Sequence, residues 1–135
     1  MNTITLIEDV MTLRRIAGPD QVAAILEGGT GEEGEFFREK IAEYAERFLT
    51  MPKVYEQDGK GDEAVAYLHY FTGGMDWYIT ERDTIEIQDQ AFGLADLGCG
   101  AELGYISIVE LIQNGVELDL HWEPKTLGAI KGGAS

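Results

Sequence analysis

The pattern of apolar and polar residues divides the chain into a helical first third and an extended remainder. Up to Thr50, apolar residues recur at the three- and four-residue spacing of amphipathic helices. From Ala64 onward, aromatic and β-branched residues cluster in short runs between glycines, which is typical of strands and turns. We therefore expect an α+β fold, with N-terminal helices packed on one face of a mostly antiparallel β-meander and a short helix near the C-terminus.

Two short helices are expected first. The capping-box pair Thr5 and Glu8 predicts the start of a helix that Gly18 can close. Pro19 suits the first turn of a second helix, which Gly28 and the glycine after it would end. Because both helices are short, their stability has to come from packing against other elements.

A longer third helix carries the most regular apolar stripe in the chain. Thr30 and Glu33 have the spacing of a second capping box. The helix should end at Met51, because a residue that precedes a proline is pushed out of helical geometry. Its predicted core-facing residues are Phe37, Ile41, Tyr44, Ala45, Phe48 and Leu49.

The extended part begins after a polar loop at residues 56–63. Residues 65–71 and 77–80 are predicted strands, joined by a hairpin turn at Gly73 and Gly74. Both faces of the first strand are largely apolar, so this strand should be central in the sheet.

Residues 84–87 and 90–96 are expected to complete the meander as short strands. The stretch from Ala91 to Ile108 is punctuated by glycines, and we interpret it as the strand and turn around which the sheet is built. Glu102 would lie in this turn, where a carboxylate often accepts backbone N–H bonds and fixes the turn.

A further short helix and a last strand are expected near the C-terminus. Ser107 and Glu110 have capping-box spacing, which predicts a helix over residues 108–114. Residues 116–122 then alternate apolar and polar, the pattern of an edge strand. Residues 128–135 are expected to be a mobile tail.

Length and composition indicate one domain. A chain of 135 residues should form a single domain, with a helical part at 1–50 and an α+β part at 51–127. Its 44% hydrophobic and 26% charged residues are those of a soluble globular protein, and its single cysteine excludes an internal disulfide. The lack of a leader and of an apolar run of roughly 20 residues predicts a cytoplasmic protein without a membrane partner.

Charge is the one bulk property that is out of the ordinary. The 25 acidic and 10 basic residues give a net charge of −15. Residues 1–60 hold 12 acids and 7 bases (net −5), whereas residues 61–135 hold 13 acids and 3 bases (net −10). Such a field repels nucleic acid and anionic membranes and attracts basic surfaces, although the same charge is also typical of plain solubility.

A series of short motifs follows in a fixed order along the second half of the chain. They are Tyr55; Gly61, Asp62, Glu63 and Ala64; Tyr70, Phe71 and Thr72; Trp77, Tyr78, Thr80 and Glu81; Phe92, Gly93 and Leu94; Glu102, Leu103, Gly104, Tyr105 and Ser107; and Asp119, Leu120, His121 and Pro124. Through these motifs, residues from about Met51 to Leu127 resemble a family of small bacterial proteins known as a domain of unknown function from plasmids, prophages and integrative elements. The resemblance implies an α+β fold and a mobile-element setting, and it supplies no activity and no catalytic residue.

The sequence departs from the family pattern in two places. Gly73 and Gly74 replace a proline- and aromatic-rich insertion that tends to follow Thr72. Leu118 stands where the family often has an arginine, so an anion-binding or ion-pair role of that arginine does not carry over.

A few side chains could support chemistry. Asp119 and His121 lie two apart on a predicted strand, so both would point to one face and could share a metal ion or a proton. With Glu102 they suggest a small divalent-metal-dependent hydrolase or nuclease, although no spacing matches a known zinc motif. His69 is flanked by aromatic residues, which favours a packing role, and Asp96 is a further carboxylate to examine.

The favoured hypothesis is a non-enzymatic accessory protein of a mobile element that binds a basic or nucleic-acid-binding protein. Its carboxylates would occupy a groove made for phosphates, as a DNA mimic that inhibits a restriction or CRISPR system would do. No cofactor, metal or direct nucleic-acid contact is expected, the oligomeric state stays open, and an adaptor without a charge-dependent role is a further alternative. The expected partner-binding carboxylates are Glu81, Asp83, Glu86, Asp89, Glu117, Asp119 and Glu123.

Overall fold

A five-stranded antiparallel sheet forms the body of the computed structural model, which describes residues 3–28 and 34–132. The strands are β2 (Leu68–Thr72), β3 (Met75–Glu81), β4 (Ala91–Asp96), β5 (Ala101–Ile106) and β6 (Glu117–Leu118). Their spatial order is β5-β4-β3-β2-β6, so β2 to β5 form an antiparallel meander, whose strands differ in part from those predicted, and β2 is an inner strand, as predicted. Gly73 and Gly74 turn the predicted hairpin with φ values of 47° and 86°, which glycine adopts without strain.

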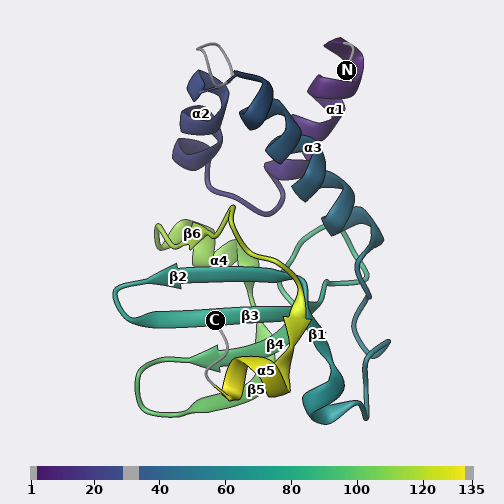
Figure 1. Cartoon of the computed structure of the whole chain (residues 1–135), viewed down its shortest axis with the longest axis vertical. Helices are drawn as coiled ribbons and strands as arrows, with labels where there is room; N and C mark the ends of the chain where they lie inside the picture. Colours follow the sequence, from purple (N-terminus) through teal and green to yellow (C-terminus); the bar gives the residue numbers. More distant parts are fainter. Residues whose placement is uncertain (1–2, 29–33, 133–135) are drawn as a thin grey trace.

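Three N-terminal helices form one end of the molecule, beyond the β6 and β2 edge of the sheet (Figure 1). They are α1 (Thr3–Leu13), α2 (Pro19–Gly28) and α3 (Gly34–Thr50). Leu13, Ile41 and Phe48 from these helices belong to the same buried cluster as Leu68 and Tyr70 of β2. The helices and the sheet therefore share one hydrophobic core, and the α+β fold class is confirmed.

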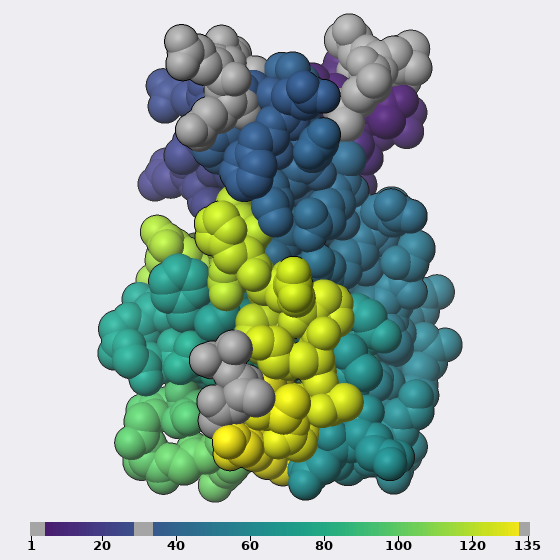
Figure 2. All heavy atoms as spheres, in the orientation of Figure 1, coloured from purple at the N-terminus to yellow at the C-terminus, as the bar shows by residue number. Residues whose placement is uncertain are grey.

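Different elements cover the two faces of the sheet. On the face that we call the helical face, Tyr70 and Ile79 pack into the core with α4 (Ile108–Gln113) and the N-terminal helices. On the opposite face, which we call the C-terminal face, residues 119–131 cross the strands and pack Trp122 against Leu94. Figure 2 shows this segment, in yellow, lying across the front of the molecule.

A small second sheet holds the crossing segment in place. β7 (Lys125–Thr126) pairs antiparallel with β1 (Val65–Ala66) and leads into α5 (Leu127–Lys131). The N-cap residue Thr126 accepts a hydrogen bond from the backbone N–H of Ala129, and Lys131 pairs with Asp62 of the short helix η1 (Gly61–Glu63) at 2.9 Å.

The sequence predicted neither β7 nor α5, and residues 128–131, expected in a mobile tail, form a helix instead. Residues 133–135 lie outside the described residues.

The helix boundaries confirm some capping signals and correct others. Helix α2 begins at Pro19 and α3 ends at Thr50, as predicted, whereas α1 begins at Thr3 and already ends at Leu13. Thr5 therefore lies inside α1 and not at its N-cap, and Gly18 does not close this helix. The pair at residues 30 and 33 lies outside the described residues. Of the predicted core residues of α3, Leu49 is 50% exposed, because the stripe that faces the core ends at Phe48.

One strand prediction is wrong and another is wrong in part. Residues 84–87 form a loop and not a strand, because the carboxylate of Asp83 accepts the backbone N–H groups of Ile85 and Gln90. The expected edge strand at 116–122 is reduced to the two residues of β6, since Asp119 accepts the backbone N–H of His121 and turns the chain.

The stretch from Ala91 to Ile108, predicted as a strand and a turn, contains the two strands β4 and β5. The turn is confined to residues 97–100, where Gly98 and Gly100 have positive φ values, and residues 101–106 form β5. Glu102 is thus a strand residue at the sheet edge and does not fix a turn. Helix α4 agrees with its prediction, because the Ser107 hydroxyl accepts the backbone N–H of Glu110 and caps the helix.

Candidate functional site

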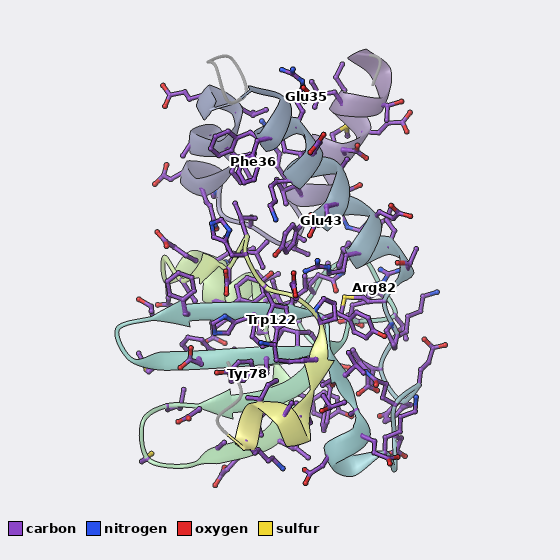
Figure 3. The ribbon with its side chains drawn as sticks, in the orientation of Figure 1. Glu35, Phe36, Glu43, Tyr78, Arg82 and Trp122 are labelled. Carbon is purple, nitrogen blue, oxygen red and sulfur yellow. The ribbon has the colours of Figure 1, made fainter. Side chains whose placement is uncertain are left out.

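His69 of β2 lies between two carboxylates on the C-terminal face. Its Nδ1 atom is 2.9 Å from Asp119 Oδ2, and its Nε2 atom is 2.8 Å from Asp76 Oδ1. Each ring nitrogen is thus within hydrogen-bond distance of a carboxylate, and the two carboxylates together fix the orientation of the ring. The ring stacks on Tyr78 with centroids 4.8 Å apart, and Trp122 covers it at 5.0 Å. We call these five residues the His69 cluster; its Tyr78 and Trp122 lie close together in Figure 3.

Helix α3 fixes the chain segment that completes the His69 cluster. The hydroxyl of the buried Tyr44 donates to the carbonyl of Asp119 at 2.9 Å and accepts the backbone N–H of Trp122 at 3.0 Å. Arg47 donates to the carbonyl of Trp122 at 2.8 Å. These bonds satisfy backbone groups of Asp119 and Trp122, so residues 119–122 are held in one position against His69.

Three carboxylates form a row across the sheet next to this cluster. Glu117 pairs with Phe71, Phe71 with Asp76, and Asp76 with Asp96. Residues directly opposite one another on neighbouring strands point to the same face, so Asp76, Asp96 and Glu117 all lie on the C-terminal face. We call these three the acidic row. Burial, followed by the charges of Asp76 and Asp96, raises the pKa of Tyr78.

A cavity of about 150 Å³ opens on the same face at the other end of β3. One wall is the loop that follows α3, and the other walls come from β3, β4, β5 and the start of α5. We call it the Glu81 cavity. Its lining includes Tyr55, Gln57, Asp58, Thr80, Glu81, Phe92, Leu103, Tyr105 and Leu127.

A β-bulge points Glu81 toward this cavity. Strict alternation along β3 would place Glu81 on the helical face with Trp77 and Ile79. The pairing with β4 shifts register between Ile79 and Glu81, so that Glu81 lies opposite Phe92, on the C-terminal face. Glu81 is only 4% exposed, and it lines the cavity.

The carboxylate of Glu81 has weak partners. The backbone N–H of Gln57 lies 3.4 Å from Oε1, at the outer limit of a hydrogen bond, and the Thr80 hydroxyl lies 3.1 Å from Oε2. The same hydroxyl is 3.1 Å from the carbonyl of Phe92, and it has only one proton to donate. Within residues 3–28 and 34–132, no basic side chain forms an ion pair with Glu81.

The loop wall of the cavity is rigid and locally strained. The buried amide of Gln57 donates to the carbonyls of Val65 and Thr80 and accepts the backbone N–H of Val65, at 2.8 to 2.9 Å. Tyr55 has a φ of 81°, a left-handed conformation that costs a bulky residue about 1–3 kcal/mol. This conformation brings the Tyr55 hydroxyl to 2.9 Å from that of Tyr105. That hydrogen bond, and after it burial and the nearby negative charges, raises the pKa of Tyr105.

The structure does not bring Asp119, His121 and Glu102 together, so the predicted metal site made of these three residues is wrong. Asp119 follows β6 at one edge of the sheet, whereas Glu102 lies on β5 at the other edge. Glu102 pairs with Ala95 and therefore points to the helical face. His121 is exposed and shares no strand with Asp119, whose carboxylate faces His69 instead. Among the described residues, no group of three or more potential ligands is arranged to hold a metal ion.

The seven carboxylates expected to bind a partner do not form one surface. Glu81 and Asp83 are each only 4% exposed, so neither lies on an open surface. Glu86 and Asp89 are exposed in the loop between β3 and β4, and Glu117 is exposed near the opposite ends of these strands. Glu123 is exposed just before β7, and Asp119 is half-buried in the His69 cluster.

Sequence reasoning missed three residues that shape these sites. Asp76 was not singled out, although it lies next to the hairpin that sets its register against His69. Gln57 and Tyr55 lie in a polar loop, and nothing in the local pattern signals a buried amide or a left-handed tyrosine. Tyr55 and Glu81 do belong to the series of short motifs, which was the one available signal.

Comparison with known proteins gives a family and no activity. No curated protein and no solved structure was found to match the chain. None of the helices in the described ranges combines the length and the apolar composition that crossing a membrane requires. One family, described as a protein of unknown function, matches residues 40–127, which include the end of α3 and every strand of both sheets. The chain therefore belongs to the DUF2958 family.

Proposed function

We propose that this protein is a non-enzymatic binding protein whose C-terminal face recognises a basic surface of a partner protein. The carrying observation is the acidic row, in which Asp76 and Asp96 lie opposite each other on neighbouring strands and Glu117 lies two strands away from Asp76, beyond Phe71. Strands in a sheet are about 4.8 Å apart, so Asp76 and Asp96 are closely spaced, and Glu117 extends the row at about twice that spacing. A line of this kind gives a basic partner both attraction and a defined register.

Two of the three carboxylates in this row have no basic partner within the protein. In the part of the chain that the structure describes, Asp96 and Glu117 form no ion pair with a basic side chain, whereas Asp76 pairs with His69. Like charges directly opposite on neighbouring strands, such as Asp76 and Asp96, destabilise a sheet. A partner that supplies positive charge would relieve this repulsion.

The kind of partner follows from the charge and from the family resemblance. Basic grooves that bind phosphates also attract rows of carboxylates. The resemblance is to proteins from plasmids, prophages and integrative elements, and hosts defend themselves against such elements with nucleic-acid-binding proteins. We therefore extend the proposal to a mobile-element protein that blocks a host defence protein as a DNA mimic.

The proposal is tested by reversing charge in the row. The double variant Asp96→Lys and Glu117→Lys should weaken binding to an arginine-rich peptide at low salt, measured by fluorescence anisotropy, and should flatten the salt dependence. The matched control is Glu102→Lys with Glu110→Lys, which changes the net charge equally but lies on or behind the helical face. Equal losses in both double variants would show that only net charge matters and would refute a defined surface.

A further inference from the structure

The Glu81 cavity has the size and chemistry of a site for one cationic side chain. Its volume of about 150 Å³ is below the roughly 300–1,000 Å³ of pockets for drug-sized ligands, so it has room for the end of one side chain. We propose that the cavity binds the guanidinium group of an arginine from the basic partner. This inference deepens the proposed function and rests on it only for the source of the arginine.

The buried carboxylate supplies the first part of the recognition. Glu81 is 4% exposed, and its two present contacts leave free lone pairs on both oxygens, since an ionised carboxylate offers about four acceptor sites. A charged group that is buried without an opposite charge is costly, and a cation that enters the cavity offsets this cost. Asp58, exposed at the same cavity, adds negative charge.

The aromatic lining favours arginine over lysine. Tyr55, Phe92 and Tyr105 line the cavity, and the rings of Phe92 and Tyr105 meet edge to face at 5.6 Å. A guanidinium is planar and weakly hydrated, so it stacks on aromatic faces and loses less than an ammonium when it leaves water. Its parallel N–H groups can also bind both carboxylate oxygens at once.

The frame around the carboxylate is built before any ligand arrives. Gln57 is bonded to Val65 and Thr80, the bulge fixes the direction of Glu81, and Tyr55 is held in a left-handed conformation against Tyr105. Backbone strain of this kind persists only where the surrounding structure enforces it, and it gathers at binding sites. A preformed site binds its ligand without a further ordering cost.

The experiment is a titration of the whole chain with N-acetyl-arginine amide, followed by NMR chemical shifts of the cavity residues. We expect saturable shifts at Tyr55, Tyr105 and Phe92, and an at least tenfold weaker affinity for Glu81→Gln, because charged hydrogen bonds are the strong ones. Glu86→Gln is the matched control, since Glu86 is exposed in the loop that follows β3 and does not line the cavity. Leu103→Trp, which enlarges a lining residue and leaves the carboxylate intact, should also abolish binding.

The outcomes separate this inference from the proposed function. Absence of shifts in the wild-type chain, or equal affinity in Glu81→Gln, would overturn the inference even if the arginine-rich peptide still binds through the acidic row. Equal or tighter binding of N-acetyl-lysine amide would overturn the choice of a guanidinium. Binding of the amide in the cavity together with no effect of the acidic-row variants on peptide binding would support the inference and refute the proposed surface. If free arginine binds tenfold more tightly than the amide, the site serves a small molecule, and a partner's side chain is refuted as its occupant.

Discussion

The His69 cluster and the Glu81 cavity lie on the same face of one sheet and treat buried negative charge in opposite ways. In the His69 cluster, two carboxylates have the imidazole ring of His69 between them, with nitrogen–oxygen distances of 2.8 and 2.9 Å. In the Glu81 cavity, a more deeply buried carboxylate has a distant backbone N–H and a shared hydroxyl. Only the first site is complete without a ligand.

This contrast between the two sites shows which carboxylates of an acidic protein indicate a binding role. Many of the 25 acidic residues are exposed, where water solvates them and ion pairs contribute little. The carboxylates of the His69 cluster are satisfied within the chain and are expected to stabilise the fold. Glu81 is only 4% exposed and, within the described residues, has no basic partner, so its burial is costly to the fold and suggests a role in binding.

The largest expected effect is a loss of stability when Gly93 is replaced, because this glycine allows β4 to lie close to β3, the strand that contributes to both sites. A Cβ atom on Gly93 would lie 2.0 Å from the Tyr78 carbonyl oxygen and 3.0 Å from the Ile79 Cα atom. Gly93→Ala should therefore lower the free energy of unfolding by about 3 kcal/mol or more, measured by urea denaturation. Gly104→Ala is the matched control, because Gly104 pairs with Gly93 and its Cβ would meet no atom within 4 Å. A similar loss in both variants would show that backbone entropy, and not the close approach, sets the cost.

The next effect separates the two histidines of the chain. His69→Ala removes the ring that contacts both Asp76 and Asp119 and stacks on Tyr78, so we expect a loss of about 2–3 kcal/mol in the free energy of unfolding. His121→Ala should change it by no more than about 0.5 kcal/mol, because His121 is exposed. Chemical denaturation of the two variants at neutral pH checks this, and equal losses would contradict the role of the His69 cluster in stability.

A third pair of variants compares the two kinds of carboxylate directly. Asp119→Asn should cost about 1–2 kcal/mol, because it weakens a charged hydrogen bond to His69. Glu81→Gln should be neutral or should stabilise the protein by up to about 1 kcal/mol, because it removes an unpaired buried charge and keeps the shape of the side chain. Thermal unfolding of both variants is the measurement. A large destabilisation by Glu81→Gln would mean that Glu81 is a structural residue.

The smallest expected effect is on the titration of Tyr78 and Tyr105. The pKa of Tyr78 is raised by burial and then by Asp76 and Asp96, so Asp96→Asn should lower it, as measured by NMR titration. Asp58→Asn should instead lower the pKa of Tyr105 and leave that of Tyr78 unchanged.

The pH dependence of stability follows from the sign of the Tyr78 shift. Because the pKa of Tyr78 is higher in the folded than in the unfolded state, the contribution of Tyr78 to stability is fully present below about pH 10. This contribution is lost as the pH rises through the folded-state pKa. The loss above pH 10 should be smaller in Asp96→Asn. An unchanged profile would show that burial alone determines the shift of Tyr78.

The sequence correctly predicted those elements that are determined by neighbouring residues. The hairpin at Gly73 and Gly74, the start of α2 at Pro19 and the cap of α4 at Ser107 each depend on a few neighbouring residues, and each was predicted. Strand β7 and helix α5 escaped prediction because β7 forms only by pairing with β1, about half the chain away. Contacts between distant segments leave no local pattern.

The candidate site was less accessible to sequence reasoning than the fold. Alternation along β3 places Glu81 on the helical face, and only the bulge after Ile79 turns it toward the cavity. The pairing of Asp119 with His69 depends on the turn that ends β6 after two residues, whereas a longer strand would have aligned Asp119 with His121. Both errors come from treating a strand as regular where the backbone departs from regularity.

The pairing of β1 with β7 also has a consequence for how the chain matures during translation. Val65 lies opposite Thr126, so some sixty intervening residues have to leave the ribosome before this ladder can close. Until then Leu94 lacks its cover of Trp122 and Leu127, and the nascent sheet presents apolar surface. Truncation of the chain shortly before Thr126 should therefore leave Leu94 uncovered and promote aggregation.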